Sequence, residues 1–280
     1  MHNITRGKKM KKGLWKKQYI YYLLACISLV TIVFTGIQLI LWKKDQLHIQ
    51  KLKSELENTK QEKTLSKESI LINPPNDPND TYWNYVDIPF LQVDFTDLLE
   101  QNSDTVGWIQ IPNTNVDYPI VQTKDNNYYL THAFDYSYNK AGWIFSDFRN
   151  NLSHMNPNTV IYGHGRYDNS MFGSLRFLLE DSWYQDINNH IIKISTTKEN
   201  MIFEIFSVYT IPVENYYITT HFKDDETFQN FLNIMVSRSL FSFSTTVNTK
   251  DKILTLSTCQ NDNGIRVVVH AKLIKKETRS

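Results

Sequence analysis

The chain has 280 residues, of which 41% are hydrophobic and 13% aromatic, and its formal net charge at pH 7 is +1. This composition excludes a disordered protein for most of the length, and the near-neutral charge gives no general indication of nucleic-acid binding. Without its N-terminal segments the chain keeps about 200 residues, which suits one domain with a sizeable core.

The N-terminal segment has the features of a membrane anchor. Residues 1–18 are rich in lysine and arginine, and an uncharged run extends from Tyr19 to Trp42. As a helix this run would be about 36 Å long, enough to cross a hydrocarbon core with some tilt. The basic flank predicts a cytoplasmic tail over 1–18, a single-pass signal-anchor helix over 19–42 and an extracytoplasmic remainder. A cleaved secretory signal is the alternative, but no small-x-small cleavage site closes the run.

Residues 43–81 are predicted to separate this anchor from a folded domain. From Lys43 to Ser69 the sequence is polar and helix-prone, with Leu47, Leu52 and Leu56 as a thin apolar stripe, which predicts a stalk helix. The three prolines between residues 73 and 80 end any helix and mark a linker. The folded, catalytic domain is therefore predicted over 82–280.

Short strands dominate the pattern from residue 82 onward. A helix is predicted over 94–100, a second helical segment over 170–179 and a third over 224–240. The apolar residues of the third recur at helical spacing and are expected to face the core: Phe228, Phe231, Leu232, Met235 and Val236. Strands are predicted over 106–112, 116–122, 142–145, 159–164, 191–196, 201–211, 253–259 and 265–273. Successive strands at short spacing predict a mainly β fold, a barrel or closed sheet with peripheral helices.

The two cysteines differ in their predicted location. Cys26 lies in the membrane span and Cys259 is the only extracytoplasmic cysteine, so no disulfide forms within the domain. Turn-forming residues follow Cys259 and predict a hairpin. With a four-residue loop over 261–264, Cys259 faces Arg266, with the two Cβ atoms about 5 Å apart. A neighbouring cation favours the thiolate and could stabilise an oxyanion. The alternative is a buried, inert cysteine beside a surface arginine.

The strand before the turn alternates in character. Thr255, Ser257 and Cys259 share one face, whereas Leu254 and Leu256 take the other. The face that carries the cysteine is therefore predicted to be the polar floor of a cleft.

A thiol nucleophile usually needs a histidine nearby. His270 lies on the same face as Arg266, but four residues along the strand is about 13 Å, beyond hydrogen-bond reach. His164 ends the predicted strand 159–164, where a flexible Gly-His-Gly segment can project the ring over a neighbouring strand. His164 is therefore the predicted partner of the thiol.

These residues carry a family resemblance. The stretch T-L-S-T-C followed by R-V-V-V-H-A-K-L, with the upstream N-T-V-I-Y-G-H and M-F-G-S-L, resembles the sortases and, among them, class B. The resemblance covers about Tyr82 to the C-terminus and implies a closed β-barrel of about eight strands. It also implies a cysteine transpeptidase of the Gram-positive cell surface. Such enzymes cleave an Asn-Pro-x-Thr-x sorting signal after Thr through a thioester and transfer the protein to a peptidoglycan amine.

The resemblance assigns roles to individual residues. Cys259 would be the nucleophile, His164 the general acid and base, and Arg266 the group that stabilises the oxyanion or the substrate. Substrate contacts would come from Asn126, Leu130, Tyr162, Tyr217 and Ser257. The helix over 224–240 would help to wall the substrate groove. Whether Asp262 or Asp168 orients His164 stays open.

No cofactor or metal is expected, although Asp147, Asp168, Asp224 and Asp225 are the carboxylates that could be combined into an oxygen-rich site. The expected partners are secreted proteins with sorting signals, a peptidoglycan stem or bridge amine, and the membrane through the N-terminal helix; nucleic acid is not among them.

Two other classes of function remain open at this point. One is a hydrolytic cysteine peptidase with the same three residues, in which water resolves the acyl-enzyme. The other is a membrane-anchored binding protein with a non-catalytic Cys259, for which Cys259→Ala would leave the function intact. An L,D-transpeptidase is disfavoured because its S-H-G-C signature is absent.

Overall fold

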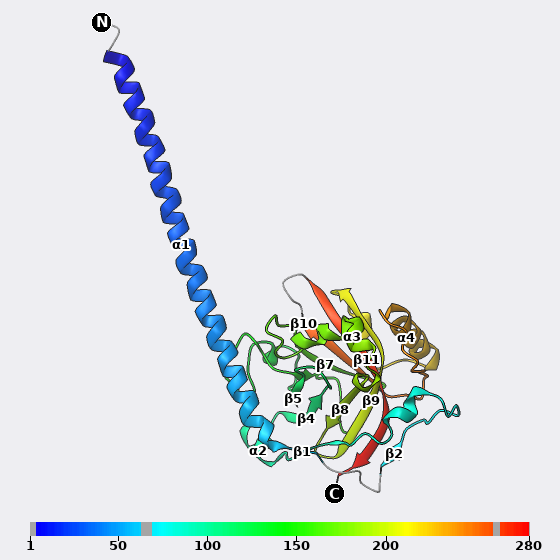
Figure 1. Ribbon diagram of the computed structural model, residues 1–280. Helices are drawn as coiled ribbons and strands as arrows, with labels where there is room; N and C mark the ends of the chain where they lie inside the picture. Colours follow the sequence, from blue (N-terminus) through cyan, green and yellow to red (C-terminus); the bar gives the residue numbers. More distant parts are fainter. Residues whose placement is uncertain (1–3, 63–68, 260–263, 280) are drawn as a thin grey trace. The chain divides into compact units, whose positions relative to one another are not determined.

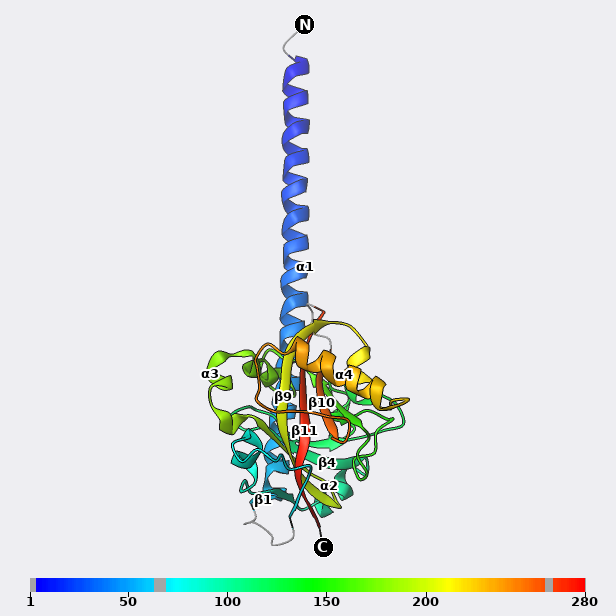
Figure 2. The same cartoon turned by 90° about the vertical axis from the view of Figure 1, so that its right-hand side faces the viewer.

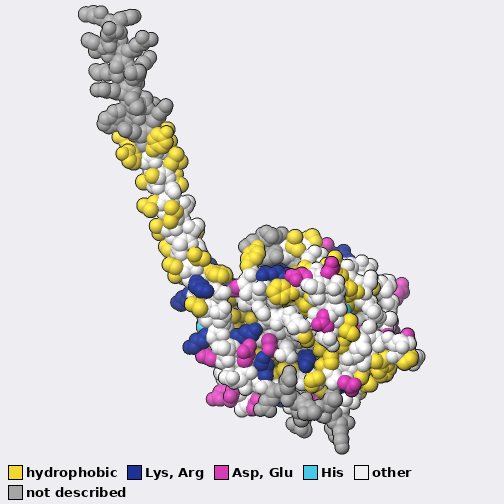
Figure 3. Space-filling model, in the orientation of Figure 1, with side chains coloured by type: hydrophobic (Ala, Val, Ile, Leu, Met, Phe, Trp, Pro, Cys, Tyr) yellow, Lys and Arg dark blue, Asp and Glu magenta, His cyan; other side chains and the backbone are white. Residues whose placement is uncertain are grey.

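The computed structural model describes residues 4–62, 69–259 and 264–279 (Figure 1). The chain forms two compact units, Met1–His48 and Ile49–Ser280. Helix α1 (Ile4–Leu56) supplies the first unit and its last residues belong to the second. Its large apolar side chains from Tyr19 to Trp42 are exposed (Figure 3). By length and composition, α1 is the one helix in the described part of the chain that could cross a membrane.

Eight strands of the second unit close into a barrel. In spatial order they are β10, β7, β6, β5, β4, β8, β9 and β11, and pairing of β10 with β11 completes the circle. Their bounds are β4 Thr105–Gln110, β5 Asp117–Val121, β6 Phe145–Ser146, β7 Asn158–His164, β8 Ile191–Ser195, β9 Glu199–Pro212, β10 Ile253–Cys259 and β11 Ile265–Thr278. Figure 2 shows β9, β11 and β10 side by side. The predicted mainly β, closed barrel is confirmed.

The barrel is mixed, and its interior is a packed core. The pairs β5–β6 and β7–β10 are parallel and the remaining neighbours in the barrel are antiparallel. Alternate residues along each strand point inward. Leu254 and Leu256 of β10 therefore pack with Trp108, Phe203 and Val269 in one buried cluster. Burial of this apolar surface is the main force that holds the strands in register.

Short helical segments surround the barrel. They are η1 Glu57–Thr59, η2 Thr81–Tyr85, α2 Thr96–Gln101, η3 Tyr128–Leu130, η4 Gly173–Leu179, α3 Asp181–Tyr184, η5 Ile187–Asn189, η6 Tyr216–Ile218 and α4 Asp225–Arg238. The predicted helix over 170–179 is thus a 3-10 segment. The predicted strand over 142–145 contributes only Phe145 to β6, since Gly142 has a left-handed φ of 59°.

Helix α4 packs on the outside of the barrel. Asp224 caps its N-terminus by accepting a hydrogen bond from the Thr227 amide at 2.8 Å. The predicted apolar stripe is buried except at its last member, because Val236 is 47% exposed. Inclusion of Val236 in the core was therefore wrong. This residue follows Met235, and neighbours in a helix are about 100° apart, so it turns away from the barrel.

The second unit includes residues that lie before the predicted domain start at 82. Ile49, Leu52 and Leu56 are buried in the main core, whereas Leu47 is 53% exposed. Strand β1 (Lys60–Glu62) then pairs with β3 (Leu91–Val93), and β2 (Ile70–Leu71) pairs with β11. The apolar stripe predicted for a free stalk thus packs, from residue 49 onward, against the barrel domain.

Candidate active site

The two residues predicted as nucleophile and base end two neighbouring parallel strands. The ladder between β7 and β10 runs from Asn158↔Ile253 to His164↔Cys259. Because the strands are parallel, their C-terminal ends meet at one rim of the barrel. The backbone of Cys259 is therefore paired with that of His164.

The adjacent hairpin has the register predicted from its turn. Strands β10 and β11 pair from Ile253↔Lys272 to Ser257↔Val268, and continuation of this register leads to Cys259 opposite Arg266. Just beyond Ser257↔Val268, the Val267 amide donates to the Thr258 side-chain oxygen at 2.8 Å. The side chain of Cys259, most of the turn and Asp262 lie outside the described residues.

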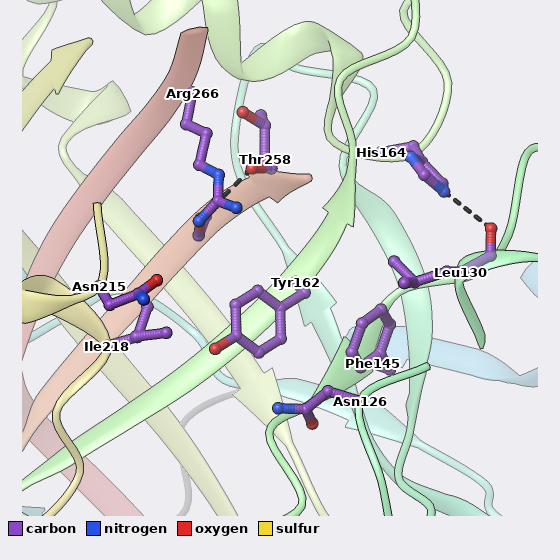
Figure 4. Close-up of a pocket in the computed structure, with 10 residues that line it drawn as sticks. Asn126, Leu130, Phe145, Tyr162, His164, Asn215, Ile218, Thr258 and Arg266 are labelled. Atoms are coloured by element: carbon purple, nitrogen blue, oxygen red, sulfur yellow. Dashed lines mark hydrogen bonds between the residues drawn. The ribbon is translucent and has the colours of Figure 1, made fainter. Parts of the chain in front are cut away.

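A pocket of about 350 Å³ opens at this rim (Figure 4). Its lining includes six residues predicted for the site: Asn126, Leu130, Tyr162, His164, Ser257 and Arg266. Four further lining residues were not predicted: Phe145, Asn215, Ile218 and Thr258. Asn215 and Ile218 come from the segment around η6, and no lining residue comes from α4. The wall of this pocket on that side thus comes from the segment before α4, and a contribution of the helix to the wider groove stays a prediction.

His164 is held by a backbone carbonyl. Its Nε2 atom lies 2.8 Å from the carbonyl oxygen of Leu130 (Figure 4). Because a carbonyl only accepts, Nε2 carries the hydrogen, and Nδ1 of the neutral ring keeps its lone pair. Burial lowers the pKa of His164, and this effect outweighs the opposing one of the Leu130 carbonyl. Asp168 binds Arg166 and Ser170, so no hydrogen bond connects it to His164.

Two glycines allow the backbone to pack this closely. A Cβ atom on Gly142 would lie 2.9 Å from the Leu130 carbonyl oxygen and 3.0 Å from the His164 ring. A Cβ atom on Gly163 would lie 2.4 Å from the Ile144 side chain. The glycine before His164 therefore allows β7 to pack closely against Ile144.

Arg266 is anchored on the opposite side of the pocket. Its Nη1 atom donates to the hydroxyl of Tyr217 at 2.8 Å, and that hydroxyl lies 3.0 Å from the Ser257 hydroxyl. Tyr217 is fully buried and lies behind the pocket lining. The Nε atom of Arg266 is buried and has no hydrogen-bond partner among the residues that the structure describes. Arg266 lines the pocket, and a guanidinium carries several N–H donors, so it can also donate to a ligand there.

The polar face of β10 is only in part a cleft floor. Ser257 lines the pocket, but Thr255 is fully buried and its hydroxyl contacts Asn158 and the Nδ1 atom of His270. His270 is also fully buried, and its Nε2 atom lies 2.9 Å from the Tyr209 hydroxyl. The prediction was therefore wrong for Thr255, because the segment after β9 covers this part of the strand.

Three of the four acidic residues considered for a cation have other partners. Asp147 and Asp168 form ion pairs with Arg149 and Arg166 at 2.7 and 2.9 Å, and Asp224 caps α4. Within residues 4–62, 69–259 and 264–279, no group of three or more His, Cys, Asp or Glu side chains is arranged to hold a metal ion.

Known proteins resemble this chain in both sequence and structure. A sortase domain profile matches residues 109–274. Sortase B of Listeria monocytogenes is 38% identical over 183 residues, which cover 64% of this chain and 74% of that protein. Sortase B of Staphylococcus aureus is 38% identical over 184 residues, covering 65% and 75%.

Solved structures extend the likeness. The crystal structure of B. anthracis sortase B in complex with AAEK1 matches with a TM-score of 0.67 and 34% identity, covering 83% of this chain and 99% of that one. A Staphylococcus aureus sortase B-substrate complex matches with a TM-score of 0.61 and 38% identity, covering 65% and 84%. The chain therefore belongs to the sortase family, and within it to the class B sortases.

Proposed function

We propose that this sortase cleaves a C-terminal sorting signal of the Asn-Pro-x-Thr-x type after Thr, through a thioester on Cys259, and transfers the protein to a peptidoglycan amine. The observation that carries this proposal is the parallel ladder that ends in the pair His164↔Cys259 beside a pocket lined by Arg266. This arrangement supports the proposal that these three residues act together at one rim of the barrel.

The proposed steps follow from the state of each group. The lowered pKa of His164 favours a neutral ring whose Nδ1 atom can accept the thiol proton of Cys259. The thiolate attacks the Thr carbonyl carbon, and the developing oxyanion accepts a hydrogen bond from the Arg266 guanidinium at the pocket wall. Collapse of this intermediate breaks the C–N bond, and the imidazolium protonates the leaving amine. An incoming amine then loses its proton to His164 and attacks the thioester, which releases the thiolate.

The pocket supports an extended peptide as the substrate. It combines apolar walls from Leu130, Phe145 and Ile218 with polar groups from Asn126 and Ser257. A relative in Staphylococcus aureus has been solved as a sortase B-substrate complex. We propose Asn126, Leu130, Tyr162 and Ser257 as substrate contacts. Tyr217 would act through Arg266, since it lies behind the lining.

We also propose the cellular arrangement. Residues 1–18 form a cytoplasmic tail, residues 19–42 a transmembrane signal-anchor, and the barrel domain is extracytoplasmic. The support is the exposed apolar surface of α1 between Tyr19 and Trp42 and the lysine- and arginine-rich segment before it. This places the catalytic domain where secreted proteins and peptidoglycan amines are available.

The test uses the full chain in detergent with an Asn-Pro-Gln-Thr-Asn peptide and a diaminopimelate or glycine-based amine. Mass spectrometry is expected to detect a Thr–amine product, and Cys259→Ala is expected to abolish it. Cleaved peptide without an amine adduct would indicate a hydrolytic peptidase instead. Intact peptide, together with no methanethiosulfonate labelling of Cys259, would contradict the proposal and favour a binding protein.

A further inference from the structure

Asp147 is a buried carboxylate beneath the pocket, two residues after the start of β6. It is 0% exposed and does not line the pocket, yet it contacts two residues that do, Asn126 and Tyr162. We propose that Asp147 is a positioning residue that holds Tyr162 as an acceptor and Asn126 as a donor toward an amide group of the bound peptide. This inference rests on the proposed function, because it assigns a task to the same groove.

The two carboxylate oxygens of Asp147 receive five hydrogen bonds. Oδ1 accepts from the backbone amide of Arg149 at 2.9 Å and from its Nε atom at 2.8 Å. Oδ2 accepts from Arg149 Nη2 at 2.7 Å, from the Tyr162 hydroxyl at 2.9 Å and from Asn126 Nδ2 at 3.0 Å. A carboxylate has about four lone-pair sites. Asp147 is therefore saturated and cannot itself bind a substrate group.

The ion pair with Arg149 keeps this carboxylate charged. Burial alone would raise the pKa of Asp147, but the hydrogen bonds from Arg149 and Tyr162 outweigh it and leave the pKa below its usual value. Arg149 also donates from Nη2 to the Ile218 carbonyl at 3.0 Å. The same arginine thus connects Asp147 to the pocket wall around η6.

An ionised carboxylate can only accept, and this fixes the direction of both neighbouring bonds. The Tyr162 hydroxyl must donate its hydrogen to Asp147, so its oxygen offers only lone pairs to a ligand. Asn126 must turn Nδ2 toward Asp147, and its Oδ1 atom accepts from the Phe148 amide at 2.9 Å. The second hydrogen on Nδ2 is then the free donor of this side chain.

The groove therefore presents one acceptor and one donor in a defined order. Figure 4 shows the Tyr162 ring and the Asn126 amide along the same side of the pocket. A primary carboxamide carries an N–H and a carbonyl oxygen side by side, so it can satisfy both groups at once, whereas a carboxylate would have no hydrogen for the Tyr162 oxygen. The chemistry points to an amide of the peptide. If Tyr162 offered a hydrogen, or if Asn126 offered its oxygen, the amide would no longer fit both groups.

The experiment measures peptide binding to the full chain in which Cys259→Ala prevents turnover. On this background, Asp147→Asn replaces one accepting oxygen with a donor. The dissociation constant of the Asn-Pro-Gln-Thr-Asn peptide, measured by calorimetry, is expected to rise at least about tenfold. The matched control is Asp117→Asn. Asp117 also receives hydrogen bonds from three residues, Lys60, Trp108 and Gln110, none of which lines the pocket, and the control is expected to leave binding unchanged.

A double-substitution cycle separates positioning from general stability. Because Tyr162 and Asn126 depend on one carboxylate, Tyr162→Phe and Asn126→Ala should together weaken binding less than the product of their separate effects. This cycle does not require Asp147→Asn to fold. The melting temperatures of all variants serve to detect a merely structural defect.

The outcomes distinguish the two proposals. An unchanged dissociation constant in a folded Asp147→Asn variant, or effects of Tyr162→Phe and Asn126→Ala that simply multiply, would overturn the positioning role and leave the proposed function intact. An equal loss of binding in Asp147→Asn and Asp117→Asn would also overturn it. A parent chain that neither binds nor cleaves the peptide would overturn both.

Discussion

The hydroxyl of Tyr217 connects two residues of the candidate site that come from different strands. It accepts from Arg266 of β11 at 2.8 Å and lies 3.0 Å from the Ser257 hydroxyl of β10. Tyr217 is fully buried, so water cannot replace a lost contact there. The orientation of the Arg266 guanidinium therefore depends on this phenol.

Tyr217→Phe is expected to lower kcat/KM for peptide transfer by about tenfold, because one Arg266 donor loses its acceptor. The measurement is steady-state kinetics of the Thr–amine product. Tyr216→Phe is the matched control, since its hydroxyl lies 3.4 Å from that of Tyr209 and does not contact the pocket. Equal rates for the Tyr217 variant and the unsubstituted chain would contradict the role assigned to Arg266.

The sequence indicated the residues of the candidate site that belong to motifs. It did not indicate the role of residues whose contacts form only in the folded chain. Cys259 and His164 end strands and Arg266 is the second residue of one, so strand prediction and turn chemistry placed them together. Asp147 and Arg149 stand two residues apart after a very short strand, and charged pairs of that spacing occur on many surfaces. The partners that make Asp147 important, Asn126 and Tyr162, are 21 and 15 residues away in the sequence.

At the scale of elements, the end of α1 behaves as part of the barrel domain. Leu56 is 1% exposed and packs in the main core with Ile49 and Leu52. Lys53 donates to the Asn115 carbonyl at 2.9 Å and lies over the Tyr118 ring. The helix that leaves the predicted membrane span thus contributes core residues to the enzyme.

Leu56→Ala is expected to lower the free energy of unfolding by about 2–5 kcal/mol, because it removes a fully buried side chain and leaves a cavity. Leu47→Ala, in the same helix but exposed, should change it by less than about 0.5 kcal/mol. Chemical denaturation of the full chain in detergent, followed by fluorescence, measures both. Similar values for the two variants would show that the segment does not pack on the barrel.

Strands were predicted correctly where polar and apolar residues alternate over several positions. They were missed where a strand is very short and its pairing partner lies far along the chain. The strands β4, β5, β8, β9, β10 and β11 were expected within a few residues of their observed bounds. The short strands β1 and β2 were read as stalk and linker, because two or three residues carry no periodic signal and their partners, β3 and β11, lie far along the chain. Such pairings depend on the completed barrel.

At the scale of the whole molecule, the buried His270 makes the barrel sensitive to acid. Burial lowers its pKa to about 3, whereas an unfolded histidine titrates near 6.5. Between these values the unfolded chain binds a proton that the folded chain does not. The stability associated with a neutral His270 is therefore present above about pH 6.5 and is lost progressively as the pH falls toward 3.

When the pH falls from 7 to 5, His270 alone should lower the free energy of unfolding by about 2 kcal/mol. His270→Gln cannot titrate, so its stability should fall by that much less over the same interval, even if it is less stable at pH 7. Denaturation curves at the two pH values for both chains measure the difference. Parallel pH dependence in the two chains would show that His270 is not the responsible group.

The ladder between β7 and β10 has a consequence for how the enzyme can vary. Its pairs advance in steps of about 3.3 Å, and a slip of one residue would reverse the faces of a whole strand. The strands therefore either keep the register that pairs His164 with Cys259 or lose this pairing completely, and no intermediate register exists. We therefore expect substitutions in the barrel core to lower the fraction of folded molecules, and substitutions of His164 or Cys259 to lower the activity of each folded molecule. In genetic terms, substitutions of the first class lower the dose of working protein, whereas those of the second class leave the dose unchanged and impair the protein itself.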